Sequence, residues 1–149
     1  MSFISRILGT RSAPQWCVAH LEEDGKPVIL RSRSVMPVAP DPKDYPWLAV
    51  ITWTYDGKDS GMPSTEENER MCELEDMLEA KIERKRICIQ TASRTGNGRR
   101  EWNYYARSEE TFMTALNGAL GHLPPFPIEI AFYDEPDWQS FQDILASHQ

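Results

Sequence analysis

The sequence has few of the residue patterns that mark a known chemistry. Its three cysteines, Cys17, Cys72 and Cys88, form an odd, scattered set without CxxC spacing, and its three histidines form no HxxxH or HExxH motif. This pattern indicates neither a disulfide framework nor a zinc site. We therefore expect no metal, no cofactor and no catalytic residue of a recognisable kind, and a reducing compartment, the cytoplasm.

Long apolar runs are also lacking. No stretch is long enough to cross a bilayer, and the N-terminal MSFISRILGTRS contains too short an apolar run for a secretory signal. Phe3, Ile4, Ile7 and Leu8 have the spacing of one amphipathic turn. We expect this turn to dock on the domain, because membrane anchoring needs more apolar area.

Basic residues are missing from the last part of the chain. From Ser108 onward there is no Lys or Arg, against seven acids, and the net charge is −7. Such a molecule should repel nucleic acid and anionic membranes. Between Arg84 and Arg107, by contrast, lie seven basic residues and one acid, Glu101. We favour pairing of this basic stretch with the acidic remainder over a binding patch, because charge runs are usually solvated faces.

The length and composition fit one domain. A chain of 149 residues with 40% apolar residues can build a single sizeable core. We divide it into an arm (1–14), a β-hairpin (15–36), a connector (37–46) and a main α+β unit (47–149). The connector contains four prolines, so we expect it to be extended and not helical.

The clearest structural signal is a hairpin centred on Asn97-Gly98, the dipeptide that a type I′ turn favours. The turn predicts a register that pairs Arg94 with Glu101, Ser93 with Trp102, Thr91 with Tyr104, and Ile89 with Ala106. One predicted face is mostly apolar: Ile87, Ile89, Thr91, Trp102, Tyr104 and Ala106. The other is mostly polar: Cys88, Gln90, Arg94, Glu101, Asn103 and Tyr105.

The order of the other elements predicts the fold class. Strands are expected at residues 16–21, 27–33, 47–55 and 128–132, with the third in the centre of the sheet. Helices are expected after Ser64, which has Glu67 three residues on as in a capping box, after Ser108, and after Glu135-Pro136-Asp137. Residues 47–149 thus predict a ferredoxin-like βαββαβ unit with both crossover helices on one face. The N-terminal hairpin either extends this sheet or covers an edge, and a short C-terminal helix is added.

Four runs resemble a known family: YPWLAVITWTYDG, MCELEDMLE, TGNGRREWNYYA and PIEIAFYDEPDWQSF. They are similar to the bacterial domain of unknown function 695 family, over roughly residues 16–145. That family has no assigned activity, so the resemblance implies no catalytic residue. The C-terminal half is also distantly similar to the bacterial regulators of ribonuclease E activity B, acidic non-enzymatic proteins that bind and inhibit an enzyme. The extra hairpin and the basic turn depart from that pattern, so the target is not carried over.

Two surfaces are candidate binding sites. The first is acidic, Asp134, Glu135 and Asp137, beside Trp138, which we expect in the core. Its structural alternative is capping of the last helix, for which one acid is enough. The second surface lies on the hairpin and comprises Arg94, Asn97, Arg99 and Arg100. Gly96-Asn97-Gly98 does not form a phosphate-binding loop there, because no Gly-Lys-Ser/Thr and no helix follow it.

The sequence itself does not determine a function. The favoured hypothesis is a non-catalytic regulatory module of the bacterial cytoplasm that binds a basic protein through the acidic surface. The alternative is a small hydrolase or transferase that binds an anionic substrate at the arginine-rich hairpin. The row Trp102, Tyr104 and Tyr105 resembles base-stacking aromatics, but it lacks the RNP pattern, so we expect packing and no nucleic acid. A homodimer stays open.

Overall fold

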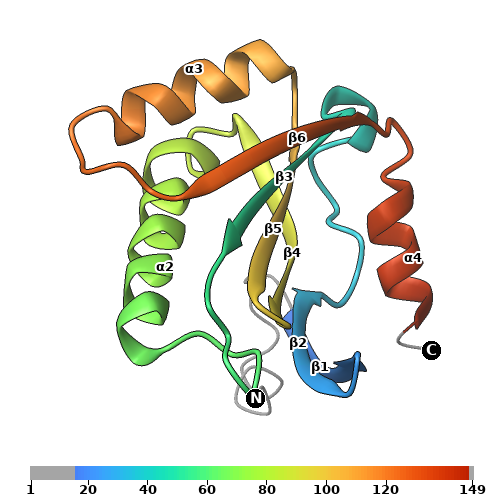
Figure 1. Cartoon of the computed structure of the whole chain (residues 1–149). Coiled ribbons are helices and arrows are strands. Elements are labelled where there is room, and N and C mark those ends of the chain that lie inside the picture. The colour runs from blue at the N-terminus through green and yellow to red at the C-terminus, as the bar shows by residue number, and fades with distance from the viewer. Residues whose placement is uncertain (1–15, 148–149) are drawn as a thin grey trace, which may run out of the picture.

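The computed structural model describes residues 16–147, so the expectations for the arm lie outside the described residues. The elements are β1 (Trp16–Glu23), β2 (Lys26–Arg33), the 3-10 helix η1 (Pro42–Asp44), β3 (Trp47–Thr54), α2 (Thr65–Leu78), the π-helical turn η2 (Glu79–Glu83), β4 (Cys88–Gly96), β5 (Arg99–Ala106), α3 (Glu109–Leu120), β6 (Ile128–Asp134) and α4 (Gln139–Ser147). The structure is α+β (Figure 1), as expected.

All six strands join one antiparallel sheet in the order β1-β2-β4-β5-β3-β6. β3 lies between β5 and β6, so it is an interior strand, as its apolar faces suggested, but β4 and β5 occupy the centre of the sheet. The N-terminal hairpin extends the sheet, because β2 pairs with β4. We expected an extended connector without helix, but part of it forms the 3-10 helix η1. Asp41 accepts a hydrogen bond from the Lys43 N–H and caps η1, and Pro42 suits the first helical position, where its missing N–H is no loss.

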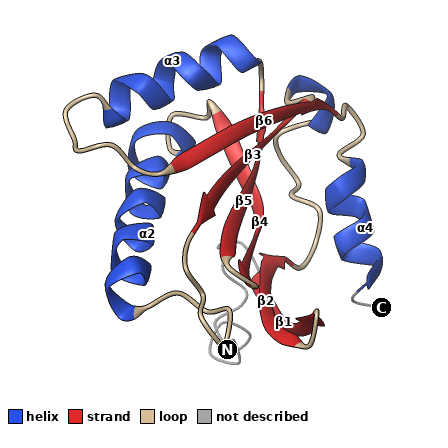
Figure 2. Cartoon of the chain, viewed as in Figure 1, coloured by secondary structure: helices blue, strands red, loops and turns tan. Residues whose placement is uncertain are grey.

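Helices cover both faces of the sheet (Figures 1 and 2). α2 and α3 lie on one face and α4 lies on the other. The larger core, under α2 and α3, is centred on Ile51, Trp53 and Trp102, each fully buried. The smaller core, under α4, contains Tyr45, Leu48, Tyr105, Trp138 and Phe141. Each face of the sheet is therefore held by its own apolar cluster.

The predicted register of the central hairpin is right near the turn and wrong further away. Arg94 pairs with Glu101 and Ser93 with Trp102, as expected. A β-bulge between Gln90 and Ala92 then shifts the pairing, so that Gln90 lies opposite Tyr104, Ile89 opposite Tyr105 and Cys88 opposite Ala106. A bulge adds one residue to one strand and so exchanges its faces beyond that point. Cys88 consequently enters the larger core, while Ile89 packs against the smaller one.

Helix α2 begins as the sequence predicts, but only half of the capping box forms. The Ser64 hydroxyl accepts a hydrogen bond from the Glu67 N–H at 3.1 Å. The Glu67 carboxylate does not return to Ser64; it accepts from Trp53 Nε1 at 2.9 Å. The buried indole N–H thus obtains the partner that a buried polar group requires, and the start of α2 is fastened to the central strand.

Candidate functional site

The three acids of the C-terminal site do not act as one cluster. Glu135 is half-buried, and its Oε1 accepts hydrogen bonds from the Tyr105 hydroxyl at 2.7 Å and from the Ser140 N–H at 3.0 Å. Its Oε2 accepts from the Ser140 hydroxyl at 2.7 Å. Glu135 therefore caps the start of α4 and ties it to the sheet. Asp134 and Asp137 are exposed, so their carboxylates can meet a partner.

Trp138 lies in the core, as expected, although it precedes α4 instead of facing inward from it. Its backbone has φ +55°, and its side chain is fully buried. The indole stacks on Tyr105, with ring centroids 4.4 Å apart and planes 10° apart, and Nε1 donates to the Tyr45 carbonyl at 2.8 Å. Burial, with the Glu135 carboxylate beside it, raises the pKa of Tyr105, so its hydroxyl stays a donor.

The hairpin arginines are divided between the two faces of the sheet. On the face of α4, Arg94 pairs with Glu23 at 3.0 Å, and Arg99 pairs with Glu23 and Glu101, both at 3.4 Å. Asn97 Nδ2 also donates to Glu23 at 2.9 Å, and this bond, with the two arginines nearby, lowers the pKa of Glu23. The hairpin charge is therefore balanced by the N-terminal hairpin and by Glu101. The acids after Ser108, which we expected as its partners, form none of these pairs.

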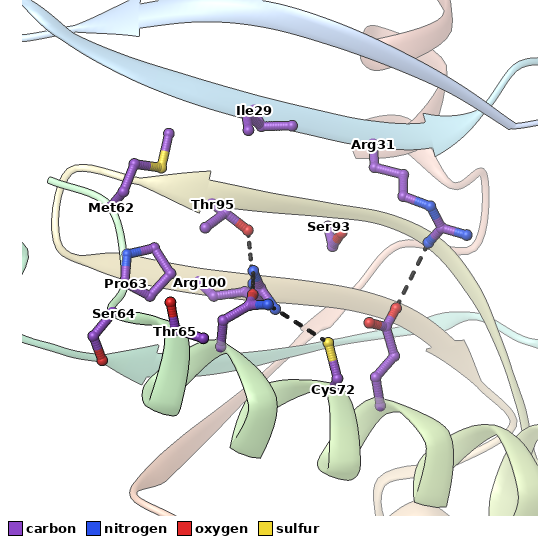
Figure 3. Close-up of a pocket in the computed structure, with 12 residues that line it drawn as sticks. Ile29, Arg31, Met62, Pro63, Ser64, Thr65, Cys72, Ser93, Thr95 and Arg100 are labelled. Carbon is purple, nitrogen blue, oxygen red and sulfur yellow. Dashed lines mark hydrogen bonds and ion pairs between the residues drawn. The ribbon is translucent and has the colours of Figure 1, made fainter. Parts of the chain in front are cut away.

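Arg100 lies on the opposite face, in a groove between α2 and strands β2 and β4 (Figure 3). Its Nε donates to Thr95 Oγ1 at 2.7 Å, and its Nη2 donates to Asn68 Oδ1 at 2.8 Å. The surrounding cavity measures about 470 Å³. We call it the Arg100 cavity; it is lined among others by Ile29, Met62, Pro63, Thr65, Ser93 and Thr95. The structure thus does not bring Arg94, Arg99 and Arg100 together into one anion site.

The groove continues along α2 and η2 as a second cavity of about 440 Å³. Here the Arg31 guanidinium lies 4.1 Å from the centre of the Trp16 ring, and Arg33 pairs with Glu83 at 3.6 Å. Burial raises the pKa of Glu83. Two smaller effects oppose this rise: the hydrogen bond that the Gln90 N–H donates to the Glu83 carboxylate at 2.9 Å, and the charge of Arg33. This site was not predicted from the sequence. The available signal was Arg31 and Arg33 at alternate strand positions, which share one face.

Residues 14–146 match the model of DUF695, a family of unknown function. The chain belongs to this family. The match runs from before β1 to the penultimate residue of α4, so the hairpin β1–β2 and the groove that it forms with α2 lie within the DUF695 region. No curated protein and no solved structure shows significant similarity to the chain. DUF695 membership assigns no activity, so the roles of its residues follow from the geometry alone.

Residues 16–147 of this DUF695 chain contain neither a membrane-spanning helix nor a cluster of metal-ligating side chains. No helix in that range combines the length and the apolar character that crossing a membrane requires. The same range contains no group of three or more His, Cys, Asp or Glu side chains placed to hold a metal ion.

Proposed function

We propose that this chain is a non-catalytic module that regulates or inhibits a protein partner, with the surface around β6 as the contact. β6 pairs with β3 on one side and forms an edge of the sheet. An edge strand presents unpaired N–H and C=O groups. Addition of an extended segment to such an edge is a common mode of protein recognition.

The side chains along this edge favour a basic partner. We define the β6 surface as Glu129, Tyr133, Asp134 and Asp137, all of which are exposed. The Tyr133 side chain is 52% exposed, and it combines apolar area with a hydroxyl, as residues at the centre of interfaces often do. An exposed tyrosine among acids on an open edge is the observation that carries the proposal. No Lys or Arg occurs from Ser108 onward, which strengthens the negative field and speeds association with a basic partner.

Site-specific photo-crosslinking in the source cell tests the position of the contact. A photoreactive residue placed at Tyr133 should give an adduct with a basic protein. The matched control is Val18, which is 56% exposed on the opposite edge strand, β1. Adducts that form from position 18 and not from position 133 would refute the β6 surface as the contact.

Charge substitution tests the chemistry of the contact. Asp134→Ser with Asp137→Ser should weaken capture of the crosslinked partner, more strongly at low salt than at high salt. Asp59→Ser with Glu69→Ser makes the same change in charge at exposed positions elsewhere and should leave capture unchanged. If changing Arg94, Arg99 and Arg100 to Ser abolishes capture, whereas changing the acidic pair leaves capture unchanged, the contact lies on the hairpin and not on the β6 surface. Recovery of a small anionic metabolite and no protein would favour the enzyme hypothesis.

Three finer inferences accompany this proposal. We infer a ferredoxin-like βαββαβ unit, supported by the strand order β4-β5-β3-β6 and by α2 and α3 on one face. Cys17, Cys72 and Cys88 form no disulfide with one another, which supports a reducing compartment, the bacterial cytoplasm. The resemblance to regulators of ribonuclease E activity B rests on the sequence and is consistent with an inhibitory role.

A further inference from the structure

We propose that the Arg100 cavity binds a carboxylate group attached to a small apolar body. The cavity measures about 470 Å³, within the range of roughly 300–1,000 Å³ that is usual for small-ligand sites. It lies on the face of the sheet covered by α2, opposite the face covered by α4. It is therefore separate from the β6 surface, and its function does not depend on the protein partner proposed above.

Arg100 supplies the positive charge for this site. Its two hydrogen-bond partners, Thr95 Oγ1 and Asn68 Oδ1, are neutral, and no salt bridge joins it to a carboxylate within residues 16–147. A guanidinium has five N–H groups. One on Nε and one on Nη2 are used, so three remain, two on Nη1 and one on Nη2. These can hold a carboxylate through two parallel hydrogen bonds.

Hydroxyl groups beside Arg100 add further donors. Thr65 and Ser93 line the same cavity (Figure 3), and their hydroxyls have no hydrogen-bond partner in the described part of the chain. The one acid in the lining, Glu75, is already engaged by Arg31 at 3.6 Å and by Gln90 Nε2 at 3.3 Å. The charge of Arg100 is therefore left for a ligand, because Glu75 is balanced by its own partners.

Apolar side chains at one end of the cavity define the rest of the ligand. Met62 and Pro63 lie at one end of the view in Figure 3, and the Arg31 ion pair lies at the other. Ile29, on β2, adds a third apolar side chain to the lining. A ligand with its carboxylate on Arg100 would place an apolar group against these three side chains. A free aliphatic acid and the carboxyl terminus of an apolar peptide share this chemistry.

Protection of Cys72 from alkylation measures binding to the full chain. Cys72 is exposed and lines the cavity, so an occupant should slow its reaction, whereas Cys17, on β1, should react at an unchanged rate. The probes are hexanoate, the matched hexanol and hexylammonium, inorganic phosphate, and an apolar tripeptide with a free or an amidated carboxyl terminus. We expect protection by hexanoate or by the free tripeptide, and none by the other probes. Protection by hexanoate identifies a small acid as sufficient, and protection by the free tripeptide alone identifies a peptide terminus.

Variants connect this protection to Arg100. Arg100→Gln should weaken binding at least about tenfold, as expected for loss of charge-assisted hydrogen bonds. Arg99→Gln makes the same change one residue away, on the other face, and should leave the affinity within about twofold. Ser93→Val removes a lining hydroxyl and adds volume, so it should also weaken binding. This variant tests the cavity if Arg100→Gln does not fold. Equal protection by phosphate or hexanol, or unchanged binding in both cavity variants, would overturn the proposal.

Discussion

Glu135→Ala should destabilise the fold by about 2–4 kcal/mol, although the residue stands in an acidic run between exposed neighbours. The substitution removes three hydrogen bonds to a carboxylate and leaves the Tyr105 hydroxyl without its partner. Hydrogen bonds to charged groups contribute roughly 1.5–3 kcal/mol each, but bonds that share one carboxylate are not additive. In a chain of this size the loss should lower Tm by about 5–15 °C.

Urea denaturation measures this loss against two matched variants. Asp134→Ala and Asp137→Ala remove the same charge at exposed positions, so each should change stability by about 0.5 kcal/mol or less. In a Tyr105→Phe background, Glu135→Ala should cost about 1 kcal/mol less than in the wild type, because one of its bonds is already gone. Equal costs for Glu135 and Asp134, or no coupling with Tyr105, would refute the structural role of Glu135.

Three further predictions follow from local geometry. Gly96→Ala should destabilise the fold by about 2 kcal/mol or more, because Gly96 has φ +150° and an added Cβ would lie 2.5 Å from a β2 carbonyl oxygen. Gly118→Ala, in an open helical position, should stabilise the fold by about 0.5–1 kcal/mol, and urea denaturation compares the two variants. The raised pKa of Glu83 means that its contribution to stability falls as pH rises from 4.5 through its folded-state pKa, so Glu83→Gln should gain stability relative to wild type within that window, and a constant difference across it would contradict this. Burial raises the pKa of the Cys88 thiol, so a thiol reagent should modify exposed Cys72 in the native protein and reach Cys88 only after unfolding.

The elements that were predicted well depend on local signals. The Asn97-Gly98 turn, the Ser64 cap and the Ser108 cap each follow from a few adjacent residues, and all three are present in the structure. The bulge at Thr91 has no such local signal. Beside it, the Gln90 side chain donates a hydrogen bond to Glu75 on α2, and the Gln90 backbone N–H donates to Glu83 on η2, so its partners lie on other elements. Alternation of polar and apolar residues therefore assigned the faces of β5 correctly, and those of β4 correctly near the turn but incorrectly from Gln90 back to Cys88, beyond the bulge.

In the candidate sites, too, features with a local sequence signal were predicted and features that depend on distant residues were not. Sequence spacing correctly placed Trp138 in the core, but charge alone could not separate Glu135, which is bonded internally, from the exposed Asp134. The pairing of Arg94 with Glu23 joins residues 71 positions apart, so it became visible only once β2 was placed beside β4. The groove around Arg100 depends on that same placement.

The position of the β4–β5 hairpin in the sheet has a consequence for synthesis. β4 pairs with β2, and β5 pairs with β3, so the hairpin is the piece that joins the two halves of the sheet. At about 5–20 residues per second, several seconds of translation separate β2 from its partner β4. A nascent chain that ends before Cys88 can pair β1 with β2, but one edge of β2 and both edges of β3 stay unpaired. The hairpin then closes the edge of β2 and one edge of β3, and β6 closes the other edge of β3 once it is made.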